Sequence, residues 1–125
     1  MTEQEAFDIV VKHLFEQKRR SMSCARGRLE MPICAYRGVE GRKCAIGVLI
    51  SDEEYSPELE DKDVTTLDLD DALPPSLRGL DIVFLAELQD IHDLAELTER
   101  GTFAMGALRA SLRELAAERG LKTNF

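Results

Sequence analysis

The sequence has no tryptophan, and only two tyrosines and five phenylalanines among 125 residues. A hydrophobic core must therefore consist mainly of Leu, Ile, Val, Ala and Met. No stretch approaches the roughly 20 consecutive apolar residues that span a bilayer. The chain opens with Thr2-Glu3-Gln4-Glu5 instead of a basic region followed by an apolar signal core. We therefore expect a cytoplasmic protein that does not contact membranes.

Cysteine is also scarce. Three cysteines, an odd number, fit reduced thiols better than a disulfide framework. Cys24, Cys34 and Cys44 could bind zinc together with His13 or His92, but nine residues separate neighbouring cysteines. Structural zinc sites usually take cysteines in pairs, about two to four residues apart. Cys34 and Cys44 flank the predicted turn and are read more simply as two small buried hydrophobic residues, while the sequence does not decide whether the three cysteines are buried, metal-bound or reactive. We predict no metal and no cofactor.

Basic residues are few, and the net charge is −8. Residues 1–50 carry nine Lys or Arg against six Asp or Glu, whereas residues 51–125 carry seven against eighteen. An acidic chain is poorly suited to bind phosphate backbones, so we expect no direct nucleic-acid binding. The uneven distribution leaves a basic patch on an acidic body open, although mutual neutralisation of the two halves is the reading we favour.

Helical periodicity marks both ends of the chain. Thr2 and Glu5 have the spacing of a capping box, which predicts a helix over 3–20. Apolar residues recur at helical spacing over 77–99 and again over 102–119, where Gly120 suits a helix end. The short connection between the last two helices predicts an antiparallel pair.

Residues 32–50 contain two apolar arms around a turn with two glycines, Gly38-Val39-Glu40-Gly41. We predict a β-hairpin here. The run from Gly47 to Ile50 is ambiguous, because it could extend the second strand or begin a short helix. The predicted fold is a single domain over 1–125 of the α+β class, mainly helical, in which the hairpin follows the first helix.

Residues 52–73 are predicted to form an acidic connector. Ten Asp or Glu and one Lys lie within 52–71, and residues 64–69 have the composition of a short extended piece. Asp68-x-Asp70-Asp71 invites a calcium interpretation, but the central Gly and terminal Glu of an EF-hand loop are missing. A solvated connector, or a partner for the arginines of 19–43, fits the composition better.

Three short motifs carry a resemblance: Cys34-Ala-Tyr-Arg37, Gly41-Arg-Lys-Cys-Ala-Ile-Gly47, and Leu49-Ile50-x-Asp52-Glu53-x-Tyr55. They resemble a group of small uncharacterised phage and prophage proteins over about residues 33–60. A looser similarity covers 88–93. The resemblance implies a phage or prophage setting in the cytoplasm of a bacterial host, and it implies no particular chemistry.

The predicted hairpin suggests a binding site. Two adjacent strands would display an aromatic ring and three cations, a combination that suits a phosphate, a nucleotide or an acidic protein surface. Alternatively, these cations pair with the acids that follow them. The candidate ligand-binding or partner-binding residues are Tyr36, Arg37, Arg42, Lys43, Asp52, Glu53 and Tyr55.

An enzyme is a third possibility. Cys44 would be the nucleophile, His92 its base, and Asp93 or Asp90 the group that orients the base. No local motif supports this arrangement, and the apolar neighbours of His92 suggest packing. We therefore name no catalytic residue and favour a protein without enzymatic activity.

The leading hypothesis is a phage-type accessory protein that binds a host protein, for example as an inhibitor of a host or defence system. Its acidic surface would mimic nucleic acid in a basic groove of the partner. The alternative is a protein that binds a phosphate-bearing small molecule through the hairpin cations.

Overall fold

The computed structural model describes residues 1–23 and 34–125, and Cys24 and Ile33 lie outside these ranges. The described part is mainly helical. Its α-helices are α1 (Glu3–Gln17), α2 (Val64–Leu69), α3 (Ile82–Asp93) and α4 (Met105–Arg119). Short 3-10 turns are η1 (Val39–Gly41), η2 (Gly47–Leu49), η3 (Pro57–Leu59) and η4 (Pro75–Leu77).

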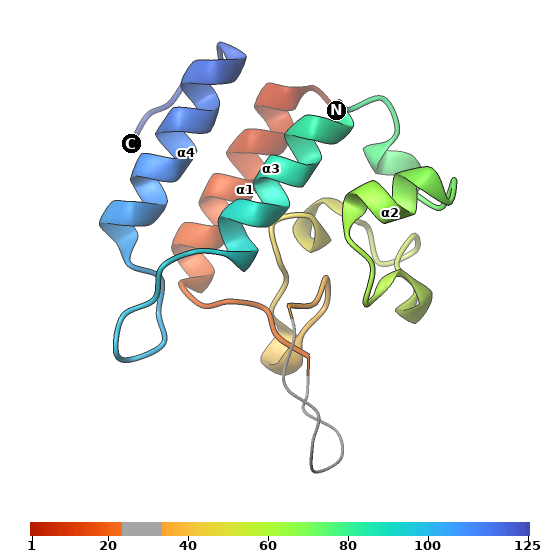
Figure 1. The fold of residues 1–125 in the computed structure, drawn as a ribbon, viewed down its shortest axis with the longest axis horizontal. Coiled ribbons are helices and arrows are strands. Elements are labelled where there is room, and N and C mark those ends of the chain that lie inside the picture. The colour runs from red at the N-terminus through yellow and green to blue at the C-terminus, as the bar shows by residue number, and fades with distance from the viewer. Residues whose placement is uncertain (24–33) are drawn as a thin grey trace.

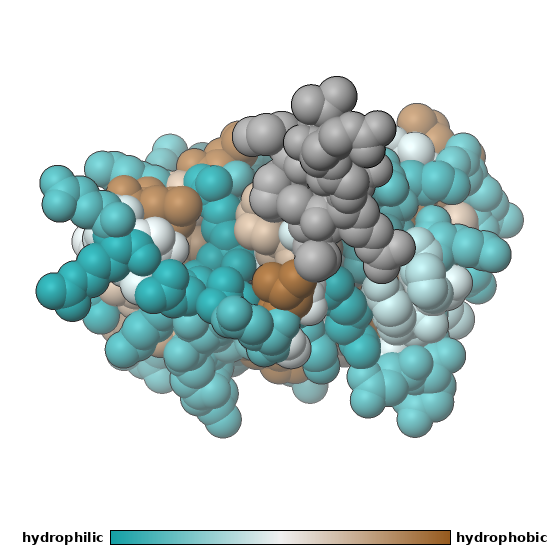
Figure 2. Space-filling model, turned by 90° about the horizontal axis from the view of Figure 1, so that it is seen from below, coloured by the Kyte–Doolittle hydropathy of each residue, from teal (hydrophilic) through white to brown (hydrophobic). Residues whose placement is uncertain are grey.

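Three long helices lie side by side, with α1 between and behind α3 and α4, and α2 lies on the other side of α3 (Figure 1). Phe7 of α1, Phe84 of α3 and Phe103, which precedes α4, are fully buried in one continuous apolar core. No helix in the described ranges is long and apolar enough to cross a membrane. The face in Figure 2 is largely hydrophilic, with small separate hydrophobic patches.

Helix α1 begins as its sequence predicts. The Glu5 backbone N–H donates to Thr2 Oγ1, and the Thr2 N–H donates to Glu5 Oε1, which completes the capping box. The helix ends at Gln17, three residues before the predicted end, because Lys18 adopts a left-handed conformation with φ of 61°. Arg19 then pairs with Thr102 in an isolated β-bridge.

The predicted β-hairpin over 32–50 is wrong, and so is the α+β class, because the described residues form no sheet. One isolated bridge joins Arg37 to Lys43, and the turn between them is η1. After Cys44 the chain takes a helical course: the Val48 N–H donates to the Cys44 carbonyl, and η2 follows.

The reason lies in the apolar spacing after Lys43. Ile46, Leu49 and Ile50 recur at intervals of three and four, and all three are buried, with η2 packed against α1. A strand would turn alternate residues of this run toward solvent. Gly47 permits the helical course because its backbone lies directly against Tyr36: a Cβ there would be 2.0 Å from the Tyr36 carbonyl oxygen.

The acidic connector also contains helical structure. Residues 64–69, expected to be extended, form α2, which packs against α3. The Asp63 side chain caps it by accepting from the Thr66 N–H at 2.8 Å. Val64 and Leu67 face the core at helical spacing. The β-branched composition suggested a strand, but the cap and the buried face outweigh that weak preference.

The two C-terminal helices run antiparallel, as predicted (Figure 1). The predicted helix over 77–99 is shorter in the structure, because Gly79 has φ of 96° and Asp81 caps α3. Helix α3 ends at Asp93, and residues 94–104 form a loop that holds the isolated bridge between Leu97 and Phe103.

Candidate functional site

Arg37 is held by groups of its own chain. Its Nη1 lies 2.6 Å from Asp52 Oδ1, and its Nη2 donates to the Ile50 carbonyl oxygen at 2.8 Å. The guanidinium also lies over the Tyr55 ring, 4.8 Å from the ring centroid. The hydrogen bond from Arg37 lowers the pKa of the Asp52 carboxyl. This cation is therefore paired inside the molecule.

Glu60 fixes the backbone that carries this arginine. Its two carboxylate oxygens accept the backbone N–H groups of Tyr36 and Arg37 at 3.0 and 3.1 Å. The Tyr55 hydroxyl donates to Glu60 Oε2 at 2.6 Å. Burial and the hydrogen bond with Glu60 raise the pKa of Tyr55 to about 12. Glu60 is the residue that joins 36–37 to the acidic connector.

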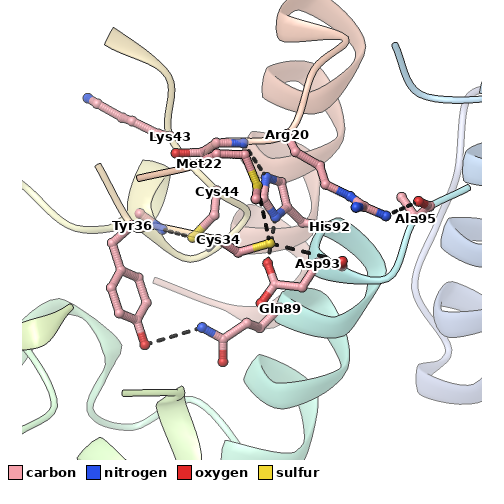
Figure 3. A network of polar contacts seen from close by, with 12 residues as sticks. Arg20, Met22, Cys34, Tyr36, Lys43, Cys44, Gln89, His92, Asp93 and Ala95 are labelled. Carbon is pink, nitrogen blue, oxygen red and sulfur yellow. Dashed lines mark hydrogen bonds and ion pairs between the residues drawn. The ribbon is translucent and has the colours of Figure 1, made fainter. Parts of the chain in front are cut away.

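The other predicted residues lie at the edges of this arrangement. Arg42 pairs with Glu40 at 2.6 Å. The Lys43 backbone bonds to Gln17, while its side chain points away from the buried network (Figure 3). Glu53 is exposed, and no ion pair in the described ranges involves it.

The structure thus brings Asp52 and Tyr55 into contact with Arg37. The Tyr36 backbone and the Tyr55 hydroxyl both bond to Glu60. Tyr36 itself is buried, so its ring is not displayed on the surface. Two of the three predicted cations are paired with carboxylates of the same chain, Arg37 with Asp52 and Arg42 with Glu40. This geometry argues against a phosphate site formed by the predicted hairpin.

A second group of polar residues surrounds the fully buried His92, on the last turns of α3 (Figure 3). The Ser21 backbone N–H donates to His92 Nε2 at 2.9 Å. Because Nε2 accepts, the neutral ring carries its proton on Nδ1, which donates to Asp93 Oδ1 at 2.6 Å. Both ring nitrogens are therefore engaged, and His92 anchors the segment after α1 to α3.

Cys34 lies beside this pair. Its Sγ is 3.7 Å from Met22 Sδ and 4.0 Å from the Asp93 carbonyl oxygen. Ligand atoms of Cys34, His92 and Asp93 all lie within 4.8 Å of one another. Burial, reinforced by the Asp93 charge, raises the pKa of the Cys34 thiol to about 11.

These three residue types can bind a metal, but the hydrogen bonds of His92 oppose it. A metal ligand must present a free lone pair, and the other ring nitrogen then carries the proton. A metal on Nδ1 would place that proton on Nε2, facing the Ser21 N–H donor. For the same reason neither nitrogen is free to deprotonate Cys34, so the trio does not act as a nucleophile and base.

Cys44, the nucleophile of the enzyme hypothesis, is packed in the core. Its Sγ accepts the Gly47 N–H at 3.2 Å, and burial raises its pKa to about 12. A reactive thiol needs the opposite environment, exposed and with a lowered pKa. The structure places Cys34, and not Cys44, beside His92 and Asp93.

A cavity of about 240 Å³ lies next to Cys34 and Asp93, between Tyr36 and Gln89. Its inner polar groups bond to the protein. The Tyr36 hydroxyl donates to the Lys62 carbonyl oxygen at 2.5 Å and accepts from Gln89 Nε2 at 3.2 Å. Gln89 Oε1 accepts the Val64 N–H at 2.9 Å, so these groups tie α2 to α3 and are not presented to a ligand.

The carboxylates of 52–71 divide into two sets. One set has structural partners: Asp52 and Asp70 in ion pairs, and Glu54, Glu60 and Asp63 in hydrogen bonds. The other set, which we call the free acids, is exposed and has no side-chain hydrogen bond or ion pair with any described residue. The free acids are Glu53, Glu58, Asp61, Asp68 and Asp71.

No protein-family model, no curated protein and no solved structure matches this chain.

Sequence reasoning missed the residues that organise the site. Glu60 is one of ten acids in 52–71, and Gln89 is one polar residue of a predicted helix. Nothing in the sequence distinguishes either residue from its neighbours. The adjacent residues His92 and Asp93 are a usable sequence signal. The enzyme hypothesis combines them with Cys44, whereas the structure places Cys34 beside them. Cys34 meets them because Met22 and Cys34 form an isolated bridge that brings the chain back toward α3.

Proposed function

We propose that this protein is a non-enzymatic binding protein that recognises a basic surface of another protein through the free acids of 52–71. The observation that carries the proposal is the asymmetry of charge pairing. Arg37 and Arg42 are neutralised by neighbouring carboxylates, whereas the five free acids remain exposed to solvent. Unpaired charges of one sign guide association with a partner of the opposite sign.

The fold supports this role by holding the free acids on ordered structure. Asp63 caps α2, the Val64 N–H donates to Gln89 of α3, and α2 carries Asp68. The Glu60 bonds fix the segment that precedes Asp61. A charged surface on a positioned scaffold loses less entropy on binding than the same charges on a flexible tail.

The phage resemblance extends the proposal. A small acidic protein of a phage or prophage would act in the cytoplasm of a bacterial host and would bind a host protein. Occupying a groove that normally takes nucleic acid would make it an inhibitor of a host or defence system. This extension is by analogy with the resembled group, and the charge asymmetry does not depend on it.

Affinity capture from bacterial lysate tests the proposal. The wild-type protein should retain one stoichiometric partner, and the triple variant Asp61→Asn, Asp68→Asn, Asp71→Asn should lose it. A matched control removes three exposed acids elsewhere: Glu99→Gln, Glu114→Gln, Glu118→Gln. Retention by the control and loss by the first variant support the proposal. Equal capture by both variants, or only nonspecific proteins with the wild type, would overturn it.

A further inference from the structure

A groove of about 350 Å³ lies between the C-terminal turns of α3 and the first turns of α4. Its apolar lining comes from both helices: Ile91 and Leu94 from the α3 side, Ala107 and Leu108 from α4. The small Ala107 side chain keeps the α4 wall low, which allows another backbone to approach closely. The groove therefore has an apolar floor between two antiparallel helices, with Asp90, Glu96 and Ser111 also in its lining.

Leu94 lines this groove and is one of the exposed apolar residues of the described surface. It follows the last residue of α3, where its backbone N–H still bonds to the Asp90 carbonyl oxygen at 2.8 Å. The residue is 76% exposed. A single exposed leucine is ordinary on a protein surface, but Leu94 adds its exposed side chain to a groove that Ile91 and Ala107 also line.

The polar rim of the groove is negative. Asp90 and Glu96 are both exposed, and neither side chain has an ion pair or hydrogen bond within the described part of the chain. No lysine or arginine is among the described residues that line the groove. Charge complementarity with this rim therefore favours an occupant that carries cations.

We propose that the groove binds a basic amphipathic helix of a partner protein. Apolar residues at i, i+3, i+4 and i+7 of that helix would cover Leu94 and Ile91, and flanking Lys or Arg would pair with Asp90 and Glu96. This inference rests on the proposed function for the basic character of the partner. It uses a different surface, because α4 and α2 lie on opposite sides of α3 (Figure 1).

A synthetic helix of Leu, Lys and Ala, with its leucines on one face, serves as the probe. Its control is a peptide of the same composition whose order gives no apolar face. Fluorescence anisotropy should show that the wild-type protein binds the amphipathic peptide at least about tenfold more tightly than the control. Equal binding of the two peptides would mean nonspecific attraction to an acidic protein and would overturn the inference.

A matched pair of variants locates the binding. Leu94→Arg places a cation in the groove, whereas Leu69→Arg makes the same change at a leucine of α2 that is 80% exposed. Leu94→Arg should weaken peptide binding at least about tenfold, and Leu69→Arg by less than about twofold. Circular dichroism checks that both remain folded. Similar losses of peptide affinity in both variants would overturn the proposal that the peptide binds in the groove.

Two further outcomes separate the alternatives. If the free protein sediments as a dimer that Leu94→Arg dissociates, the groove is occupied by a second copy of the chain and the inference fails. If the peptide binds as expected but lysate capture does not depend on the free acids, the groove stands and the proposed function fails. If lysate capture depends on the free acids but the peptide does not bind specifically, the proposed function stands and the groove inference fails.

Discussion

At the scale of single residues, close backbone packing decides where side chains are allowed. The Gly47 backbone lies against Tyr36, whose N–H is held by Glu60. Because Glu60 also binds the Arg37 N–H, neither of these two peptide groups can easily move away. The position therefore has room for a hydrogen atom and not for a methyl group.

Gly47→Ala should lower the free energy of unfolding by about 3 kcal/mol or more, since its Cβ would lie 2.0 Å from the Tyr36 carbonyl oxygen. Gly106→Ala is the matched control, because no atom lies within 4 Å of the added Cβ in α4. It should leave stability unchanged or raise it by up to about 1 kcal/mol. Urea denaturation measures both, and a tolerated Gly47→Ala would contradict the described packing.

The sequence predicts which residues lie near one another better than it predicts the contacts of each residue. The sequence grouped Tyr36, Arg37, Asp52 and Tyr55, and the structure does join the last three. It could not show that Tyr36 is buried, or that Glu60 holds both backbones, because these contacts depend on the path of the chain over 57–64. Residue spacing alone does not predict contacts that depend on how an irregular segment folds back on the rest of the chain.

At the scale of elements, α1 and the segment after η1 are joined through polar contacts. His13 Nε2 donates to the Lys43 carbonyl oxygen at 2.7 Å, and Gln17 Nε2 donates to the same oxygen at 2.9 Å. Desolvation lowers the pKa of His13, because burial disfavours the charged ring. The contact is thus made by a neutral histidine.

Stability should fall between pH 7.5 and pH 5.5 partly because of His13. Its folded pKa lies below the ordinary value of about 6.5, so the unfolded chain binds a proton first as the pH drops. His13→Gln keeps a donor for the Lys43 carbonyl and removes this titration. Thermal unfolding should therefore show a smaller decrease in Tm over this range for the variant, and an equal decrease would contradict the assignment.

Elements with a clear period were predicted well, and those without one were not. The amphipathic stripes of α1 and α4 and the capping box at Thr2 are visible in the sequence. The predicted hairpin failed because two glycines suggested a strand turn, while the spacing of Ile46, Leu49 and Ile50 was too short to reveal a helical course. For α2, a six-residue helix, the β-branched composition was misleading.

At the scale of the whole molecule, the charges are sorted by whether they have partners. In the described part of residues 1–50, four arginines are used within the fold: Arg37 and Arg42 in ion pairs, Arg19 and Arg20 with the carbonyl oxygens of Arg100 and Ala95. The free acids of the second half are not used in this way. A net charge of −8 thus reaches solvent largely as unpaired carboxylates, which is a basis for recognising a basic partner.

The most direct test of this account compares acids with cations in one titration. Calorimetry would measure the affinity of the captured partner for the Asp61→Asn, Asp68→Asn, Asp71→Asn protein and for a protein with Arg42→Gln and Lys43→Gln. The account predicts at least about a tenfold loss of affinity for the first protein and less than about a twofold change for the second. Loss of binding in the cation variant, with the acid variant unaffected, would contradict it.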